Sequence, residues 1–460
     1  MVNVLDFGAT GDGKTDDTEA LQHALEEGDG ALHLKKGTYR ITRPLVLDLT
    51  KHGFCAIRGK EAGTSRILMA GAGPAIRIIG DHRGTAQPDT VKPHTWEKER
   101  LPTINGIEIL GAHPEAVGIE LRKTMQATIG QVLVRNCKYG IHLVERNRNF
   151  LLADSHLYDN SEYGLFLDRC NLHQIIVHGN HISYNKKAGI KSLDGDVHNL
   201  QITGNDIEYN NHPGVDKSPN GEPTGAEIWF EAPEGIISEV TIASNTIQAT
   251  VQPGGANIRI WGSQQDWPRG ARLISITGNV LGSQTRGIEL RRVQRVAITG
   301  NTIYNSADLS IFASFCSGVA VGTNTFVWRG REGDSPRDGI RFEDCENGAL
   351  SGLVTQRLCA GTAEKGAGIT LTRCRDMAIS DCQILDPLVR GIELEDCIRC
   401  RVSNNSIIDR RDKPTMLNAI RVLGKSRDNL VQNNLLGGAK EQLLDILKGT
   451  AILQGNSEIV

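Results

Sequence analysis

The chain has 460 residues, of which 51 are glycine, 5% are aromatic and 23% are charged, and its formal net charge is −3. A balance so close to neutral gives no strong field for a nucleic acid or an anionic membrane surface, and we expect neither as a partner. No apolar run approaches the ~18 residues that a transmembrane helix needs.

The N-terminus has no basic segment followed by an apolar one, so no signal peptide is visible. We therefore expect either a cytoplasmic protein or a secreted one whose signal peptide has been removed.

The first 45 residues predict a cap for one end of the fold. Residues 2–7 read as a strand and residues 8–13 as a loop. Thr15 or Asp16 can then cap a helix whose apolar face carries Leu21, Ala24 and Leu25. A helix here would cover the otherwise open edge of a stack of strands.

The loop at residues 8–15 also matches the phosphate-binding pattern G-x-x-x-x-G-K-[ST]. We interpret the match as a turn, because Asp12, Asp16 and Asp17 would crowd a phosphate with negative charge. No alternation of strand and helix follows it, as a nucleotide-binding sheet requires. The sequence therefore predicts no nucleotide cofactor.

After a polar insertion at residues 81–104, one phrase recurs as far as about residue 436. It reads Gly-Ile-x-Leu, then a few polar residues, then a β-branched run ending in Gly-Asn-x-Ile, and it is clearest at residues 287–303. Where both neighbours keep the glycine, the steps are mostly 22 to 25 residues, which is the period of a solenoid with one repeat per turn. The glycines that open the other repeats are Gly118, Gly140, Gly164, Gly189, Gly225, Gly339, Gly368 and Gly391.

The phrase predicts an all-β fold built from stacked coils. Alternation over four residues makes a short strand with Ile and Leu on one face, and a coil with one apolar face must stack on its neighbours. Three short strands per coil and no helical spacer favour a single right-handed parallel β-helix of about 12 coils. We expect one domain over residues 1–460, comprising the cap at 1–45, the inserted loop at 81–104 and a closing segment at 437–460, in which residues 440–447 favour a short helix.

Four of the ten cysteines occupy equal places in the repeat. Cys170, Cys345, Cys374 and Cys397 each lie six residues after the glycine of a coil. Equal places in stacked coils become a ladder of small buried groups, so we expect reduced thiols in the interior. No CxxC pairs with a second CxxC, which argues against zinc.

Aligning the coils on their glycine gives two outward rows of side chains. The first row reads Glu120, His142, Phe166, Lys191, Glu227, Arg259 and Glu289, and the second reads Arg122, Val144, Asp168, Leu193, Trp229, Trp261 and Arg291. In this alignment Lys191, Glu227, Trp229, Glu231, Arg259, Trp261 and Glu289 share one strip. Spacing between repeats is widest there, and extra residues tend to form loops around a binding face.

The N-terminal segment resembles a known superfamily. Asp6-Phe7-Gly8-Ala9, Gly11-Asp12-Gly13, residues 15–18 and Gly37-Thr38-Tyr39 are similar to the signature of the pectate-lyase-like β-helix superfamily. The resemblance implies the fold of polygalacturonases, polysaccharide lyases and phage tailspike depolymerases. The Asn-Thr-Asp, Gly-His-Gly and Arg-Ile-Lys motifs of polygalacturonases are absent, and the only Asp-Asp lies in the cap, which argues against polygalacturonase activity. The Arg-centred signatures of classical pectate lyases are not recognisable either, so the resemblance specifies the fold and not the reaction.

The strip suits an acidic polysaccharide degraded by β-elimination. Lys191 or Arg259 could neutralise a carboxylate or remove the C5 proton of a uronic acid, and Glu227 and Glu231 could contact the substrate. Trp229 and Trp261 could stack on sugar faces. The remaining candidates for substrate binding are Asp168, Glu289, Arg291 and His142.

Two alternatives remain open at this point. A glycoside hydrolase could use Glu227 and Glu231 as its acid and base, with Asp168, Asp194, Glu208 or Glu289 as partners. A non-catalytic glycan-binding or tailspike-like module, monomeric or trimeric, would also carry such a strip. Asp194 and Asp196 could in addition provide oxygen ligands for Ca²⁺, although a turn explains them as well.

Overall fold

The computed structural model describes residues 2–28, 30–60, 63–84, 87–211, 225–264, 269–328 and 337–459. The chain divides into two compact units, the first ending at Thr241 and the second running from Ile242 onward. Within the described ranges no helix is long and apolar enough to cross a membrane.

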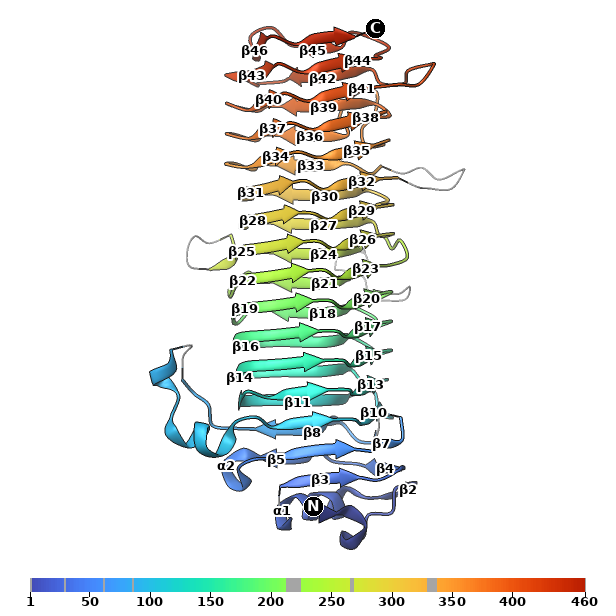
Figure 1. Ribbon diagram of the computed structural model, residues 1–460, viewed down its shortest axis with the longest axis vertical. Helices are drawn as coiled ribbons and strands as arrows, with labels where there is room; N and C mark the ends of the chain where they lie inside the picture. Colours follow the sequence, from blue (N-terminus) through green and yellow to red (C-terminus); the bar gives the residue numbers. More distant parts are fainter. Residues whose placement is uncertain are drawn as a thin grey trace. The chain divides into compact units, whose positions relative to one another are not determined.

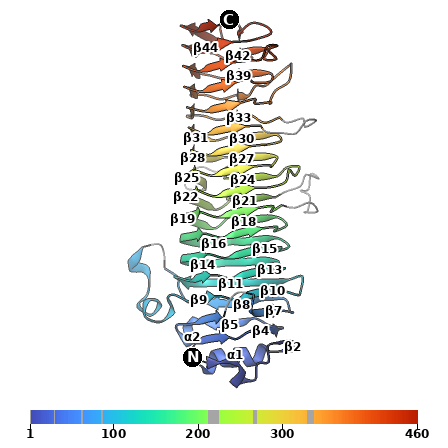
Figure 2. The ribbon, with the colours of Figure 1, turned by 45° about the vertical axis from the view of Figure 1, so that its right-hand side comes forward.

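The first unit begins with the predicted cap. Residues Thr18–Glu27 form helix α1, whose buried face consists of Leu21, Ala24 and Leu25, and α1 lies at the N-terminal end of the coils (Figures 1 and 2). The N-cap is Asp17, one or two residues beyond the predicted caps. Residues 2–7 are only partly a strand, because β1 (Val2–Asn3) gives way to a 3-10 turn at Val4–Phe7.

The phosphate-loop pattern folds as a turn whose N–H groups bind carboxylates. Asp12 accepts hydrogen bonds from the backbone N–H groups of Lys14 and Thr15, both at 2.8 Å. Asp17 accepts from those of Thr10 at 2.7 Å and Gly11 at 3.0 Å. The loop amides that could meet a phosphate therefore already bind the protein's own acidic side chains.

Each coil contributes three parallel strands. In some coils two of them merge into one long strand, because backbone pairing continues through the bend between them. In the coil of β16 (Tyr163–His178), the first half pairs with β18 (Ala188–Leu193), the second half pairs with β19 (Asp196–Thr203), and β17 (His181–Ser183) completes the turn. The predicted parallel β-solenoid is confirmed. It has about 17 turns rather than about 12, because coils that lack the Gly-Ile phrase stack equally well.

The other strands of the first unit follow the same plan. They are β2 (Asp12–Asp16), β3 (Ala31–Leu34), β4 (Gly37–Ile41), β5 (Leu45–Asp48), β6 (Ala56–Gly59), β7 (Ser65–Met69), β8 (Gly73–Ile79), β9 (Thr103–Asn105), β10 (Glu108–Gly111), β11 (Ala116–Met125), β12 (Thr128–Gly130), β13 (Leu133–Arg135), β14 (Tyr139–Ala153), β15 (His156–Tyr158), β20 (Asp206–Glu208), β21 (Ala226–Glu231) and β22 (Ile236–Ala243). A short helix, α2 (Leu49–His52), follows β5.

The second unit repeats the three-strand coil to the end of the chain. Its strands are β23 (Thr246–Gln248), β24 (Ala256–Trp261), β25 (Gly270–Thr277), β26 (Val280–Gly282), β27 (Arg286–Arg291), β28 (Val293–Thr299), β29 (Thr302–Tyr304), β30 (Leu309–Ser314), β31 (Ser317–Gly322), β32 (Thr325–Val327), β33 (Ile340–Glu343), β34 (Ala349–Ser351), β35 (Val354–Gln356), β36 (Ile369–Thr372), β37 (Ala378–Ser380), β38 (Gln383–Leu385), β39 (Arg390–Glu395), β40 (Arg401–Ser403), β41 (Ser406–Ile408), β42 (Asn418–Leu423), β43 (Asn429–Gln432), β44 (Leu435–Gly437), β45 (Leu444–Ile446), β46 (Ala451–Gln454) and β47 (Ser457–Ile459).

Two predicted peripheral segments differ in outcome. The insertion at residues 81–104 leaves the coils beside β8 and carries short turns at Pro88–Thr90 and Thr95–Glu99 before β9 begins (Figure 2). The short helix expected at residues 440–447 is wrong. That segment contains β45, which pairs with β42 and adds a further coil, because parallel pairing satisfies more backbone groups than one helical turn would.

Buried asparagines and cysteines line the turns of the coils. The side chain of Asn160 donates to that of Asn185 at 2.8 Å, and Asn185 donates to Asn210 at 2.7 Å, so the amides form a ladder across three coils. All ten cysteines are free thiols and all but Cys359 are buried, as expected for interior packing.

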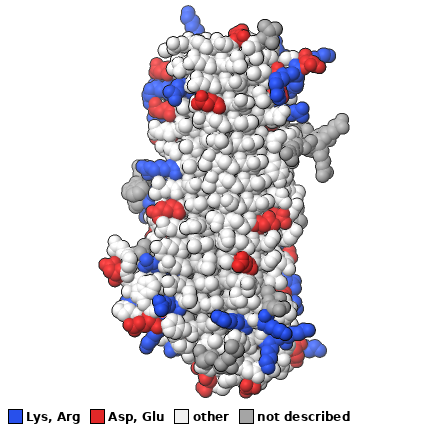
Figure 3. Space-filling view, in the orientation of Figure 1, with Lys and Arg blue, Asp and Glu red and all other residues white. Residues whose placement is uncertain are grey.

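The surface agrees with the near-neutral composition. On the face shown in Figure 3, charged side chains lie in small groups of both signs, and most of the face is uncharged. Among the described residues of this face, therefore, no large patch of one charge marks a binding site (Figure 3).

Candidate functional site

One outward row of the first unit crosses six neighbouring coils. Its register is set by parallel pairing from β8 to β21, and its side chains are Arg77, Glu120, His142, Phe166, Lys191 and Trp229. The next outward row includes Arg122, Val144, Asp168, Leu193 and Glu231. We call these two rows the acidic-aromatic strip.

The register differs from the sequence alignment at one coil. Ala188 pairs with Ala226 and Lys191 pairs with Trp229, so Gly225 is not the equivalent of Gly189. In the second unit the alignment holds, since Arg259 pairs with Glu289 and Trp261 with Arg291. Trp229 thus belongs to the row of Lys191, and the prediction that the two tryptophans occupy the same place in their coils is wrong.

The two-residue shift gives Glu227 the place of Gly189, beside the buried Asn210. Its side chain is 0% exposed, and its Oε2 accepts hydrogen bonds from the backbone N–H of Asn210 at 3.0 Å and from the Asn210 side chain at 2.7 Å. Burial raises the pKa of Glu227 well above its usual value. Glu227 therefore ends the asparagine ladder, and its expected place in the outward strip is wrong.

Lys191 is held by two neighbours on β21. Its ammonium forms an ion pair with Glu231 and lies 3.5 Å from the centre of the Trp229 ring. Its side chain is 3% exposed, whereas that of Glu231 is 20% exposed. An ammonium buried over an indole face with a carboxylate beside it is a strongly stabilised charge. Lys191 is thus placed to orient Glu231 and Trp229.

His142 lies between two carboxylates and an aromatic ring. Its Nε2 is 3.2 Å from Asp168 Oδ2, and its Nδ1 is 3.8 Å from Glu120 Oε2. Its ring stacks on Phe166 with 5.3 Å between ring centres. The side chain is 12% exposed, and the hydrogen bond to Asp168 lowers the pKa of that carboxyl. This arrangement suits a base whose protonated form is stabilised by a neighbouring carboxylate.

Two tyrosines that the outward rows omit complete this part of the strip. Tyr139 and Tyr163 stack with 5.7 Å between ring centres, and Tyr139 lies 4.9 Å from the His142 ring. Burial raises the pKa of Tyr139 to about 12 and raises that of Tyr163 as well, so both phenols remain proton donors at neutral pH. A signal for them exists in the sequence, since each precedes the glycine of its coil, at Gly140 and Gly164.

Glu120 is anchored by Arg77 on the preceding coil and by Arg122 on its own strand. Arg77 and Arg122 each place Nε 2.7 Å from Glu120 Oε1, and the Arg122 side chain remains 37% exposed. Their charges and hydrogen bonds lower the pKa of Glu120, although burial opposes the shift. Arg122 is therefore an accessible cation one coil away from His142.

The second unit contains a separate cluster built around Glu289. Arg259, Arg286 and Arg291 place guanidinium nitrogens 3.0, 3.0 and 2.8 Å from its carboxylate, and Trp261 lies between Arg259 and Arg291, 5.2 and 5.1 Å from their central carbons. Arg259 and Glu289 are buried, whereas the Arg291 side chain is 43% exposed. Burial lowers the pKa of the Arg259 guanidinium, although its ion pair with Glu289 opposes the shift. The role of Arg259 as base or carboxylate neutraliser stays a prediction. The exposed edge of the cluster can still bind an anion.

The two predicted calcium ligands have other partners. Asp194 accepts hydrogen bonds from the backbone N–H groups of Glu234 at 3.0 Å and Gly235 at 3.1 Å. Asp196 accepts from Asn171 at 2.8 Å and lies 2.9 Å from His198 Nε2. Over the described ranges, no group of three or more His, Cys, Asp or Glu side chains could hold a metal ion. Oδ1 of Asp194 is thus engaged in a turn, and both oxygens of Asp196 have protein partners.

Family models match most of the chain. A model described as a right-handed β-helix region matches residues 96–247 and 228–436. A second, described as rhamnogalacturonase A/epimerase, pectate lyase-like, matches residues 1–73. The second match covers the segment with the pectate-lyase-like motifs, so the resemblance seen in the sequence is confirmed.

Two curated proteins of Azotobacter vinelandii are similar to part of the chain. Alginate lyase 7 is 30% identical over 203 residues, 40% of this chain and 22% of that protein. Mannuronan C5-epimerase AlgE6 is 29% identical over 180 residues, 36% of this chain and 20% of that protein. The matches thus span about a fifth of the length of these relatives. Among solved structures, the Dettilon tailspike protein (gp208) is 17% identical with a TM-score of 0.48, covering 80% of this chain and 64% of that one.

Proposed function

Because the chain belongs to the right-handed β-helix family, we propose that it is a polysaccharide-modifying enzyme that removes the C5 proton of a uronic acid residue. Similarity to an alginate lyase and to a mannuronan C5-epimerase supports the substrate class. Both substrates are polyuronates, in which the carboxylate acidifies the neighbouring C5–H bond. Elimination and inversion at C5 both begin with loss of this proton.

The observation that carries the proposal is His142 beside Asp168 and the two phenols. His142 accepts the C5 proton, and Asp168, 3.2 Å away, stabilises the imidazolium that forms. Arg122, with its side chain 37% exposed, faces the substrate carboxylate as negative charge builds up on it.

We favour β-elimination, the reaction that the sequence analysis also favours from the residues of the strip. The electron pair of the C5–H bond forms the C4–C5 double bond, the C4–O4 bond breaks, and O4 takes a proton from the phenol of Tyr139. The tyrosinate then recovers its proton from His142, whose ring centre is 4.9 Å away. The phenol of Tyr139 is protonated before the step, since burial raises its pKa to about 12.

The remainder of the strip binds the neighbouring sugar. Lys191 and Trp229 lie two and three coils from His142, or ~10 and ~14 Å along the stack at the spacing of neighbouring strands. Glu231 presents a partly exposed carboxylate to sugar hydroxyls, and Lys191 holds it in place. Lys191 is accordingly assigned to positioning, in place of the role of base.

C5 inversion is a second candidate, favoured by the stacked phenols, since a tyrosine could return a proton to C5 from the opposite face. In D₂O, inversion would leave deuterium at C5 without an unsaturated product. β-Elimination would give an unsaturated chain end with ultraviolet absorbance. A hydrolase would give new reducing ends without unsaturation, and a glycan-binding module would bind polyuronates and yield no product.

The test compares His142→Ala with His156→Ala on polymannuronate, polyguluronate and polygalacturonate. His156 stacks on His181 on another sheet and serves as a matched control. Loss of a general base costs about 100- to 10,000-fold in rate, which we expect for His142→Ala alone. A His142→Ala variant that retains its rate, or a wild-type protein that shows neither an unsaturated end nor C5 deuterium, would overturn the proposal.

Oligomeric state and cellular location belong to the same proposal as predictions. We propose that the protein acts on polysaccharide as a monomer or a homotrimer. Light scattering on the purified protein distinguishes the two oligomeric states. A location outside the cell would suit a polymeric substrate, and fractionation of cells that produce the protein tests it.

A further inference from the structure

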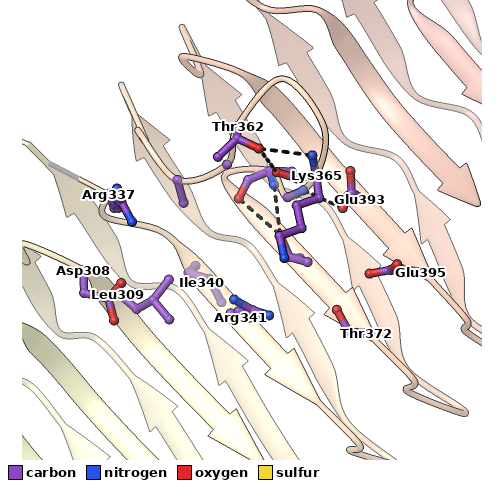
Figure 4. Close-up of a pocket in the computed structure, with 15 residues that line it drawn as sticks. Asp308, Leu309, Arg337, Ile340, Arg341, Thr362, Lys365, Thr372, Glu393 and Glu395 are labelled. Atoms are coloured by element: carbon purple, nitrogen blue, oxygen red, sulfur yellow. Dashed lines mark hydrogen bonds between the residues drawn. The ribbon is translucent and has the colours of Figure 1, made fainter. Parts of the chain in front are cut away.

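A cavity on the outward face of the second unit lies apart from every residue considered so far. It has a volume of about 190 Å³ and lies between the loop at residues 360–367 and strands β33, β36 and β39 (Figure 4). Its polar lining includes Asp308, Arg341, Lys365, Thr372, Glu393 and Glu395. Parallel pairing aligns Arg341 with Thr370 and Thr370 with Glu393, so the floor of the cavity is an outward row like the strip of the first unit.

Glu393 is a buried carboxyl with one oxygen that lacks a hydrogen bond. The residue is 1% exposed, and its Oε1 accepts from the backbone N–H of Gly366 at 2.6 Å. Its Oε2 has no hydrogen-bond partner among the residues that the structure describes. Because Oε1 is an acceptor, the proton of the neutral acid would sit on Oε2.

The two arginines nearest to Glu393 direct their hydrogen bonds elsewhere. Arg390 donates to the carbonyls of Thr362 at 2.8 Å and Ala363 at 2.6 Å, and Arg421 donates to that of Glu364 at 2.9 Å. Their closest nitrogens are 4.0 and 3.7 Å from Oε2. These bonds fix the loop over the cavity, and burial then raises the pKa of Glu393 despite the nearby positive charge.

Glu395 provides a second carboxyl with a different environment. It lies two residues further along β39, on the same face, and is only half-buried. Its strand neighbour is Thr372, whose hydroxyl also lines the cavity. A buried and a half-buried carboxyl lining one cavity provide the two groups that an acid–base hydrolysis uses.

We propose that this cavity is a second active site, which hydrolyses the glycosidic bond of the sugar at the non-reducing end of an acidic polysaccharide. Glu393 gives its proton to the glycosidic oxygen as the bond from that oxygen to C1 breaks. Glu395 takes a proton from water, and the water oxygen bonds to C1. The products are a saturated monouronate and a chain shortened by one sugar.

The dimensions and charges of the cavity specify the end of an acidic chain. Pockets for drug-sized ligands measure about 300–1,000 Å³, so a cavity well below that range holds a single sugar ring. Lys365 and Arg341 line it and can pair with the carboxylate of that ring. The choice of a polyuronate as substrate rests on the proposed function. The assignment of Glu393 and Glu395 as acid and base rests on the cavity alone.

The experiment follows saturated monouronate released from oligomannuronate, oligoguluronate and oligogalacturonate, by mass spectrometry in H₂¹⁸O. The wild type should release monouronate with ¹⁸O at C1. Glu393→Gln and Glu395→Gln should each lose about 100-fold or more of this release. Glu346→Gln is the matched control, because Glu346 pairs with Arg375 on the surface and does not line the cavity.

The outcomes separate this site from that of the first unit. His142→Ala should abolish unsaturated products and leave monouronate release intact, whereas the Glu393 and Glu395 variants should do the reverse. Absence of labelled monouronate from all three substrates, or a Glu395→Gln variant with the wild-type rate, overturns the proposal. Because Glu395 is half-buried, its variant decides the matter even if Glu393→Gln does not fold.

Discussion

Replacing Glu227 with glutamine should stabilise the protein at neutral pH and leave its activity unchanged. The Glu227 side chain is 0% exposed and ends the asparagine ladder, where Oε2 accepts two hydrogen bonds from Asn210. Burial raises the pKa of Glu227 well above its usual value, so the folded protein favours the protonated acid. Glutamine keeps the acceptor oxygen and brings no charge into the interior.

The magnitude follows from proton linkage. In the unfolded chain this carboxyl ionises near its ordinary pKa of 4.5, whereas in the folded protein it stays protonated to higher pH. Its contribution to the free energy of unfolding is complete below the unfolded pKa and falls by about 1.4 kcal/mol per pH unit above it, until the folded pKa is reached. Glutamine lacks this dependence, so the advantage of Glu227→Gln should grow as the pH rises above the unfolded pKa, by about 1.4 kcal/mol per pH unit until the folded pKa is reached.

Urea unfolding of both proteins at several pH values between about 4.5 and 7.5 measures this difference. Glu97→Gln, at an exposed position, should show no such trend. A stability difference that does not change with pH would refute the interior assignment. Loss of product formation in Glu227→Gln would restore Glu227 as a catalytic candidate.

Three other variants test the remaining assignments. Lys191→Met should raise KM for polyuronates roughly 30-fold with little change in kcat, because it removes a buried ion pair and cation–π contact worth about 2 kcal/mol; a fall in kcat alone would instead indicate a catalytic role. Asn185→Ala should lower the free energy of unfolding by about 3 kcal/mol, since it leaves buried partners in both adjacent coils unsatisfied; an unchanged urea midpoint would contradict the ladder. EDTA should leave the melting temperatures of the wild type and Asp196→Asn unaltered, because Asp194 and Asp196 have protein partners; a wild-type decrease reversed by Ca²⁺ would contradict this expectation.

The solenoid could be predicted because its rule is local. Glycine and asparagine at the turns and alternating Ile and Leu in the strands specify each coil without reference to distant residues. The same rule failed at Gly225, where the steps between coils lengthen. The alanine before the glycine predicts the register better than the glycine itself. Ala188-Gly-Ile-Lys aligns with Ala226-Glu-Ile-Trp in the structure, so Glu227 occupies the place of Gly189.

The sequence by itself determined the fold class, the capping helix and the register of Arg259 with Glu289, because each follows from periodicity or from a short run of residues. Tertiary structure alone decided which side chains meet. Lys191 meets Glu231 across a 40-residue separation, Tyr139 stacks on Tyr163, and the loop at residues 360–367 covers Glu393. The physical reason is that a side chain's environment in a solenoid comes from the coils above and below it. The irregular spacing before β21 hid a two-residue shift, which gave Glu227 the place of Gly189 and Trp229 the place beside Lys191.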